Sequence, residues 1–301
     1  KEPQKSYSWK DVYLNINKLS GEISRHIKKG DRCLLISENR PEWMISDLAI
    51  MLSGGVTVPA YTTYAERDYE YIINDCTPAI IIISDKIQYE KIKSIIHKKN
   101  FIKKVIFFEN IENINEELNL KIYDIFKKDN CNSQNFSNLK IQRKDMACII
   151  YTSGTQGNPK GVMLSHGGIL NNCEGAYGLL KTFISKRPKF LTWLPLSHSY
   201  EHTVQFVQIV VGARVFYAES IDKLIKNMSD CSPEIMTAVP RFYQNLHQKI
   251  NTSFSKATGL KKILVNQTVQ LGIKKLNKQR LSSIERFINF ICEKLIRKKI
   301  K

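Results

Sequence analysis

Residues 151–166 read Tyr-Thr-Ser-Gly-Thr-Gln-Gly-Asn-Pro-Lys-Gly-Val-Met-Leu-Ser-His, and no other stretch of the chain says as much about its fold and chemistry. An apolar run, Met146–Ile150, leads into it, and a helix-like segment from about His166 follows it. Glycines let backbone N–H groups approach an anion closely, and hydroxyl groups add hydrogen-bond donors. Lys160 supplies a mobile positive charge. A strand that leads into such a loop predicts a binding site for a polyphosphate.

This loop does not follow two common phosphate-binding patterns. A Walker A sequence needs a Gly-Lys-Ser/Thr ending, whereas Lys160 lies between Pro159 and Gly161. The dinucleotide-binding spacing also fails, because Gly154 and Gly157 lack the third glycine of that pattern. An ordinary flexible loop is the simpler alternative, since Gly, Ser, Thr and Pro are common turn residues. The density and order of hydroxyl groups, glycines and lysine favour the phosphate site.

The segment 151–161 resembles the phosphate-binding signature of the adenylate-forming enzymes, which include acyl-CoA synthetases, luciferases and the adenylation domains of peptide synthetases. Further segments resemble the long-chain fatty acid–CoA ligase branch of that superfamily, and the resemblance keeps its order from about Trp9 to Gln248. These segments are Pro41–Ile50, Gly54–Tyr61, Leu194–Glu201, Tyr217–Ile221 and Met236–Tyr243. The resemblance implies an α/β fold with two stacked, mostly parallel sheets covered by helices, the large N-terminal domain of the family in incomplete form.

Composition allows a sizeable core and limits the classes of partner. The 301 residues are 43% hydrophobic, enough for one large or two ordinary domains. The net charge of +18 raises nucleic acid or an anionic membrane as partners, but the bases are mostly lysines spread along the chain with many Ile and Asn residues. We therefore give the charge little weight and expect no nucleic acid partner. Seven cysteines without Cys-x-x-Cys spacing favour a reduced, cytoplasmic setting.

Short β-rich runs alternate with helical patterns, which predicts mostly parallel sheets covered by helices. The predicted strands are Cys33–Ser37, Val56–Ala60, Ala79–Ser84, Val105–Phe108, Met146–Thr152, Phe190–Leu194, Arg214–Ala218 and Glu234–Val239. The predicted helices are Pro41–Leu52, Glu66–Cys76, Lys86–Lys98 and Gly168–Thr182. The polar stretch Asp129–Leu139 is the best linker candidate. It suggests a first α/β lobe over residues 1–140 and a second, with the phosphate loop, over residues 141–254.

The remaining segment, residues 255–301, is helical in pattern and densely basic. Its apolar stripe comprises Ile263, Leu264, Leu271, Phe287 and Ile291. The favoured interpretation is a surface helix pair that packs on the second lobe. Peripheral contact with the inner face of a membrane is the alternative. The sequence does not require it, since each lysine near an anionic bilayer contributes only ~1 kcal/mol of binding free energy.

The resemblance implies that a carboxylate is activated on ATP and then transferred to coenzyme A. By resemblance, the loop residues hold the β- and γ-phosphates, and the Thr155 hydroxyl helps to bind Mg²⁺. These nucleotide-binding residues are Thr152, Ser153, Gly154, Thr155, Gln156, Gly157 and Lys160. Gln156 departs from the family, where a second threonine is usual, although its amide can still donate a hydrogen bond.

Three further residues are assigned by resemblance to the acyl side of the site. His198 follows an apolar run and a proline, and the family's histidine at this position lies beside the adenylate and the acyl carboxylate. Lys160 and His198 are therefore the candidate catalytic residues. Tyr200 would help to shape the acyl tunnel, and Arg241 resembles a residue of the family's substrate wall. Without the resemblance, a lone histidine is more often structural than catalytic.

A competing interpretation uses the same segment for different chemistry. His198-Ser-Tyr-Glu-His202 matches His-x-x-Glu-His, the inverted zinc-protease pattern, in which Glu201 would be the general base. The pattern is short and arises easily, and a third ligand from a later helix is not evident. Stoichiometric zinc would favour a hydrolase, whereas Mg²⁺-dependent release of pyrophosphate would favour a ligase.

The resemblance covers only the N-terminal part of a long-chain fatty acid–CoA ligase. We find no segment like the family's Tyr-Gly-x-Thr-Glu motif, whose glutamate binds Mg²⁺, and none like its small C-terminal domain. The expectation is that these 301 residues alone do not turn over. A non-catalytic protein that binds a membrane surface through its basic terminal helices is the remaining alternative. Chain-length preference and oligomeric state are not predicted.

Overall fold

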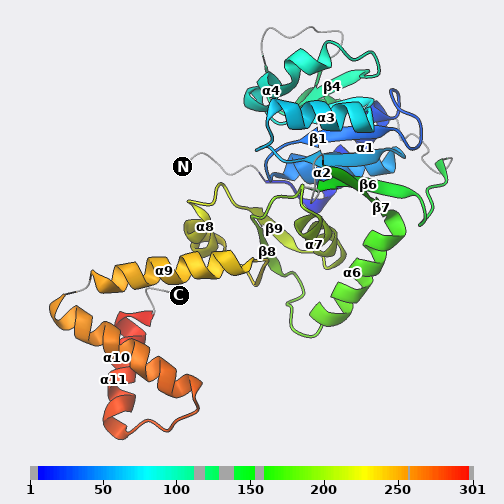
Figure 1. Ribbon diagram of the computed structural model, residues 1–301. Coiled ribbons are helices and arrows are strands. Elements are labelled where there is room, and N and C mark those ends of the chain that lie inside the picture. The colour runs from blue at the N-terminus through cyan, green and yellow to red at the C-terminus, as the bar shows by residue number, and fades with distance from the viewer. Residues whose placement is uncertain (1–5, 112–118, 129–138, 153–158, 257, 298–301) are drawn as a thin grey trace. The chain divides into compact units, whose positions relative to one another are not determined.

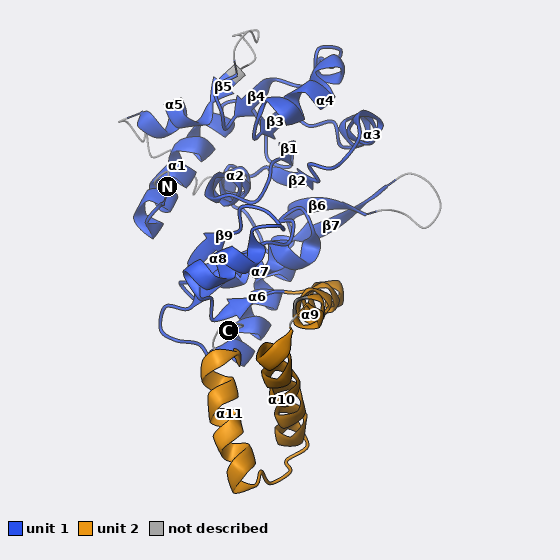
Figure 2. Cartoon of the chain, turned by 90° about the vertical axis from the view of Figure 1, so that its left-hand side faces the viewer, with its two compact units in different colours: residues 1–237 blue, residues 238–301 orange. Residues whose placement is uncertain are grey.

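The computed structural model describes residues 6–111, 119–128, 139–152, 159–256 and 258–297. The chain forms two compact units, residues 1–237 (unit 1) and residues 238–301 (unit 2), as Figure 2 shows. Among the described residues, the strands all lie in unit 1, and unit 2 consists of helices. The chemistry of the candidate site therefore has to be built mainly on the sheets of unit 1.

A seven-stranded sheet forms the centre of unit 1 (Figure 1). Its strand order is β5-β4-β3-β1-β2-β6-β7, and each neighbouring pair runs parallel except β6 and β7, which are antiparallel. The strands are β1 (Arg32–Ile36), β2 (Val56–Ala60), β3 (Ile80–Ile83), β4 (Lys104–Phe107), β5 (Asn119–Lys121), β6 (Met146–Thr152) and β7 (Lys160–Ser165). Nearly continuous apolar strands such as β3 are typical of a parallel sheet that is buried on both faces.

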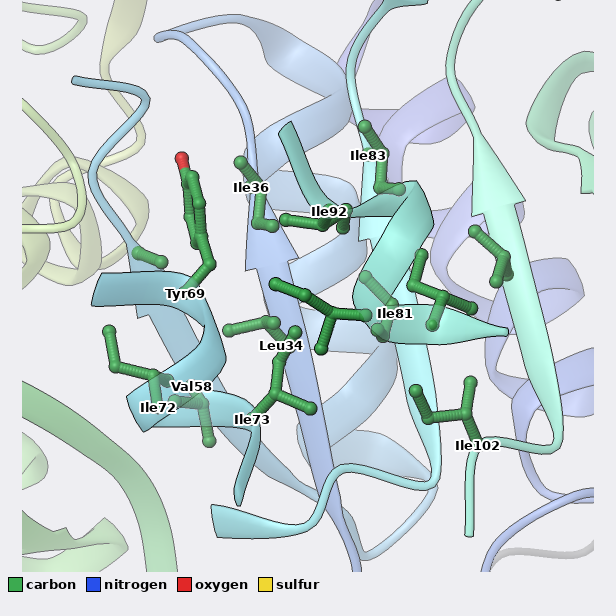
Figure 3. Close-up of a cluster of buried hydrophobic side chains, with 14 of the residues drawn as sticks. Leu34, Ile36, Val58, Tyr69, Ile72, Ile73, Ile81, Ile83, Ile92 and Ile102 are labelled. Carbon is green, nitrogen blue, oxygen red and sulfur yellow. The ribbon is translucent and has the colours of Figure 1, made fainter. Parts of the chain in front are cut away.

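Alternate side chains of this sheet enter two separate cores. Leu34 and Ile81 lie in the core beneath α3 (Glu66–Cys76) and α4 (Lys86–Ile96), which Figure 3 shows. Leu35 and Ile82 point to the opposite face. There they pack with residues of α1 (Trp9–Ile23), α2 (Pro41–Leu52) and α5 (Ile122–Lys127). The period of two along each strand thus fixes which helices cover which face.

A second, three-stranded parallel sheet has the order β10-β8-β9. It comprises β8 (Lys189–Thr192), β9 (Arg214–Tyr217) and β10 (Ile235–Met236). Helices α7 (Ser199–Val210) and α8 (Leu224–Cys231) contact β8, and α6 (His166–Leu180) packs against α7 and β7. Leu196 is buried in the same core as Trp43 of α2, and Tyr217 packs against that core. Helix α2 therefore contacts elements of both sheets.

These elements confirm the predicted α/β class with mostly parallel sheets. The predicted helices Pro41–Leu52 and Glu66–Cys76 have the bounds of α2 and α3. The predicted strands correspond to β1, β2, β3, β4, β6, β8, β9 and β10. Most differ only slightly at their ends, but the predicted strand Glu234–Val239 is reduced to β10, Ile235–Met236, because Val239 already caps α9. Runs of apolar residues were the signal that located them.

The structure differs from the prediction after the candidate phosphate-binding stretch, where β7 precedes α6. Its apolar run, Val162–Leu164, is only three residues long, and the side chains of Val162 and Met163 are exposed. Gly161 has a packing reason: a Cβ atom there would lie 2.8 Å from Cγ2 of Ile149 on β6. The candidate loop is therefore enclosed by a β-hairpin rather than by a strand and a helix.

The expected boundary near residue 140 does not separate two sheets. Strand β6 follows it and pairs in parallel with β2, so residues on both sides of position 140 build one sheet. The compact units instead divide after Thr237, rather than near residue 254. The polar linker candidate lies mostly in residues 129–138, outside the described residues, and its composition marked a connection within unit 1 rather than a domain boundary.

Unit 2 contains α9 (Pro240–Ser255), α10 (Gly259–Leu276) and α11 (Ser283–Leu295). Helices α10 and α11 pack on each other as a helical hairpin (Figure 2), with Val265 and Ile296 buried between them and Leu264 and Phe254 packed alongside. The helical character predicted for residues 255–301 is confirmed by these two helices. Over the described part of the chain, none of the helices has the length and apolar character needed to cross a bilayer.

Candidate functional site

The hairpin places two of the predicted phosphate-binding side chains at the two ends of one loop. Thr152 ends β6 and Lys160 begins β7, and the two residues are partners in the antiparallel register. Both are exposed, and the Thr152 hydroxyl donates a hydrogen bond of 3.5 Å to the carbonyl oxygen of Lys160. Ser153, Gly154, Thr155, Gln156 and Gly157 lie outside the described residues. A hydroxyl group and an ammonium group therefore flank the loop that joins β6 to β7.

The base of this hairpin is attached to the neighbouring helix. Tyr151 is buried, and its hydroxyl donates a hydrogen bond to the carboxylate of Asp75 on α3. Burial, together with the bond to Asp75, raises the pKa of Tyr151 well above its ordinary value, so the hydroxyl keeps its proton and remains a donor. This contact fixes the residue that directly precedes Thr152.

His198 lies in a loop that is fastened to the first sheet. Asn39 follows β1, and its side-chain amide donates to the carbonyl oxygen of Leu194 at 2.6 Å. The backbone N–H of Leu196 donates to the Asn39 side-chain oxygen at 3.0 Å. A single amide side chain thus fixes the strand-to-helix connection that precedes α7.

His198 itself is the N-cap residue of α7. Its Nδ1 atom accepts a hydrogen bond of 3.2 Å from the backbone N–H of Tyr200. Because Nδ1 acts as an acceptor, a neutral His198 carries its proton on Nε2, which then presents a donor. The side chains of His198 and Tyr200 are exposed, so this donor is suited to an anionic oxygen of a ligand.

The predicted site residues thus fall into three groups. Thr152 and Lys160 flank one hairpin loop, and His198 and Tyr200 share the first turn of α7. Arg241 belongs to unit 2, where it is exposed in the first turn of α9. The structure therefore brings the predicted residues together in two pairs within unit 1.

Glu201, the residue after Tyr200 on α7, is a buried acid that was not predicted to belong to a ligase site. Its Oε2 atom accepts a hydrogen bond of 2.5 Å from the hydroxyl of Thr237, whose carbonyl oxygen accepts a bond of 2.6 Å from the indole N–H of Trp193. Burial raises the pKa of Glu201 to about 7, against the smaller lowering effect of the Thr237 bond. Glu201 and Trp193 together fix the residue after β10.

His202 occupies a different environment from His198. Its Nε2 atom lies 2.7 Å from Oδ2 of Asp47 on α2, and both side chains are almost fully buried. The imidazole also contacts the rings of Trp43 and Phe206. This pair links α7 to α2 and thereby connects the helix behind His198 to the first sheet.

These contacts do not support the zinc hydrolase interpretation. His198 is exposed at the helix N-terminus, whereas His202 is turned toward Asp47 and Glu201 toward Thr237. Groups of three or more His, Cys, Asp or Glu side chains that could hold a metal ion are not found among the described residues. The His-x-x-Glu-His pattern thus reflects two buried packing contacts and one exposed cap.

Sequence reasoning missed Asn39 and Asp47 as supports of the site. Asp47 was the one acid within the apolar part of the helix Pro41–Leu52, and this charge among apolar residues was the available signal. No spacing rule, however, connects positions 47 and 202 or positions 39 and 194. Both contacts join segments about 155 residues apart and follow from how the sheets and helices pack.

Comparison with known proteins assigns this geometry to a family. The family model described as "AMP-binding enzyme" matches residues 2–293. Fatty acyl-CoA synthetase A of Dictyostelium discoideum is 29% identical over 267 residues, covering 86% of this chain and 39% of that protein. Long chain acyl-CoA synthetase 3 of Arabidopsis thaliana is 27% identical over 305 residues, covering 98% of this chain and 45% of that protein.

A solved structure shows the same fold. The red-emitting luciferase of Phrixothrix hirtus superposes with a TM-score of 0.67 at 18% identity, covering 80% of this chain and 47% of that one. The chain spans less than half the length of these curated relatives. The family model, in contrast, extends over nearly all of the 301 residues. The chain belongs to the AMP-binding enzyme family.

Proposed function

We propose that the intact protein is an ATP-dependent long-chain fatty acid–CoA ligase, and that the β6–β7 hairpin holds the nucleotide. The curated relatives carry names of fatty acyl-CoA and long-chain acyl-CoA synthetases. The observation that carries the proposal is the pairing of Thr152 with Lys160 across the hairpin. It supports a loop whose two ends offer a hydroxyl donor and a positive charge to the same anion.

On this proposal, the loop binds the β- and γ-phosphates of ATP. Ser153, Gly154, Gln156 and Gly157 would supply hydroxyl, amide and backbone donors, in addition to Thr152 and Lys160. The Thr155 hydroxyl would be a ligand of Mg²⁺, an ion that prefers hard oxygen ligands and neutralises phosphate charge. A fixed array of donors around the polyphosphate favours departure of pyrophosphate, because it needs little rearrangement as charge develops.

The acyl carboxylate would lie near His198. In the first step a carboxylate oxygen attacks the α-phosphorus of ATP, and the bond to pyrophosphate breaks to give an acyl-adenylate. The Nε2–H donor of His198 and the N-terminal end of α7 both favour negative charge at this position. In the second step the coenzyme A thiol loses its proton and displaces AMP to form the thioester. Tyr200 and Arg241 are proposed to contact the acyl substrate.

The Lys160→Ala variant tests the nucleotide part of this proposal. A hydrogen bond to a charged partner contributes about 1.5–3 kcal/mol, so MgATP affinity is expected to fall about tenfold to a hundredfold. Isothermal titration of the intact protein with MgATP measures this change. Lys160 is exposed at the start of β7, so folding should be unaffected.

The matched control is Lys144→Ala, which removes another exposed lysine of unit 1 that precedes β6. Its affinity for MgATP is expected to equal that of the unchanged protein. Equal binding by the Lys160→Ala and Lys144→Ala variants would contradict the assignment of the hairpin to the nucleotide.

A further inference from the structure

The positive charge of the chain is concentrated in unit 2. Residues 238–301 contain fifteen lysines and arginines but only two acidic residues, Glu285 and Glu293, which gives a net charge of +13. The other 237 residues carry the remaining +5 of the total of +18. The bases are indeed spread along the chain, but the acids that balance them are almost absent from unit 2. The net positive charge is therefore mainly a property of unit 2.

Both acidic residues of unit 2 are engaged with bases of the same unit. Glu285 of α11 lies 2.5 Å from the Lys274 ammonium, and Glu293 lies 3.1 Å from the Arg297 guanidinium. Arg297 also donates to the carbonyl oxygen of Thr268 on α10. The Lys274–Glu285 pair and the Arg297–Thr268 bond join the two helices, and the Glu293 carboxylate lies beside the Arg297 guanidinium. Many exposed bases of unit 2 therefore have no acid within the unit to balance their charge.

Helix α11 presents large apolar side chains to solvent. Ile284, Phe287 and Leu295 are exposed, with Phe287 at 65%, and their spacing places them on one side of the helix. The buried residues Cys292 and Ile296 lie on a different side, and α11 packs there against α10. Within unit 2, the described elements leave the side with Phe287 uncovered.

Bases border this apolar side. The Lys294 ammonium lies 4.6 Å from the centroid of the Phe290 ring, and Phe290 is itself exposed. Arg286 is exposed one residue before Phe287. Large exposed apolar side chains, lysine and arginine at their borders and little net apolar character are typical of helices that lie in the plane of a membrane surface.

We propose that α11 of unit 2 binds the surface of an anionic lipid bilayer, with Ile284, Phe287 and Leu295 entering the boundary between headgroups and acyl chains. The surrounding bases would contact anionic headgroups. The positive charge of unit 2 would also attract nucleic acid. Three exposed apolar side chains on one side of a helix, however, fit the acyl region of a lipid bilayer better than a phosphate backbone. The inference does not depend on the proposed ligase activity, since neither nucleotide nor acyl substrate takes part.

Vesicle co-sedimentation of the full chain tests this inference. We expect binding to phosphatidylcholine vesicles that contain one third phosphatidylserine, little binding to phosphatidylcholine alone, and a steep decrease as salt screens the charge. The Phe287→Ser variant should bind anionic vesicles about tenfold more weakly, because one large apolar side chain no longer enters the membrane. The Phe183→Ser variant is the matched control, since Phe183 of unit 1 is exposed to 67%.

A second pair of variants separates the local charge from the net charge. Arg286→Glu/Lys294→Glu and Lys186→Glu/Arg187→Glu change the net charge equally, but only the first pair lies on α11. The first double variant should lose vesicle binding and the second should retain most of it. Background binding to anionic vesicles, equal binding by the Phe287→Ser and Phe183→Ser variants, or equal loss in the two double variants would overturn the inference. The inference would also be overturned if an RNA oligonucleotide displaced the protein from vesicles and bound the Phe287→Ser variant with the same affinity as the unchanged protein.

Discussion

Replacement of His202 by alanine is expected to destabilise unit 1 by about 3–5 kcal/mol, because it leaves Asp47 buried without its charged or hydrogen-bonded partner. The two side chains are 2.7 Å apart and almost fully buried, and the Oδ1 atom of Asp47 already lacks a partner among the described residues. Urea unfolding monitored by tryptophan fluorescence measures the loss. All three tryptophans, Trp9, Trp43 and Trp193, lie in unit 1 and therefore report on this unit.

The His247→Ala variant provides the control for this experiment. His247 is exposed on α9 of unit 2, and a surface substitution of this kind changes stability by no more than about 0.5 kcal/mol. The double variant Asp47→Leu/His202→Leu should recover part of the lost stability, because no unpaired buried carboxylate remains. A loss below about 1 kcal/mol for His202→Ala would show that the contact between α2 and α7 does not hold these helices together.

Glu201 is expected to make the stability of unit 1 fall as the pH rises from 5 to 8. Its pKa is about 7 in the folded protein and near 4.5 when it is exposed to water. Well below pH 4.5, Glu201 is protonated in both the folded and the unfolded protein. Between pH 4.5 and pH 7, Glu201 keeps its proton in the folded protein but loses it in the unfolded protein. Stability then decreases with pH, and burying the charged form costs about 2–3 kcal/mol by pH 8.

The Glu201→Gln variant removes this titration while keeping the size of the side chain. Its free energy of unfolding relative to the unchanged protein should therefore increase by about 2–3 kcal/mol between pH 5 and pH 8. The Thr237→Val variant should extend the decline to higher pH, because loss of the Thr237 hydroxyl raises the pKa of Glu201 in the folded state only. A difference between Glu201→Gln and the unchanged protein that stays constant with pH would contradict the burial of this acid.

The sequence predicted the elements of unit 1 where local patterns sufficed. Strand β3 was recognised by its four consecutive isoleucines, which are typical of a strand buried on both faces. The helix Pro41–Leu52 was recognised by the proline at its first position. The candidate phosphate-binding stretch was proposed from another local pattern, its order of hydroxyl groups, glycines and lysine. Its enclosure by two strands was missed, because the apolar run Val162–Leu164 in β7 is only three residues long and was not recognised as a strand.

The contacts that support the candidate site could not be predicted from local patterns. The Asp47–His202 pair and the Asn39 contacts to the loop before α7 join segments far apart in the chain. The basic character of residues 255–301 was visible in the sequence, because acids are almost absent there. The structure adds that this segment and the helix before it form one compact unit, which begins after Thr237.

Exchange of labelled pyrophosphate into ATP tests the central claim, that the hairpin between Thr152 and Lys160 grips ATP for activation of a fatty acid. The intact gene product, supplied with MgATP and a long-chain fatty acid, is predicted to transfer label into ATP, and omission of the fatty acid should abolish the transfer. A folded, intact gene product that shows only background exchange with long-chain fatty acids would contradict the claim.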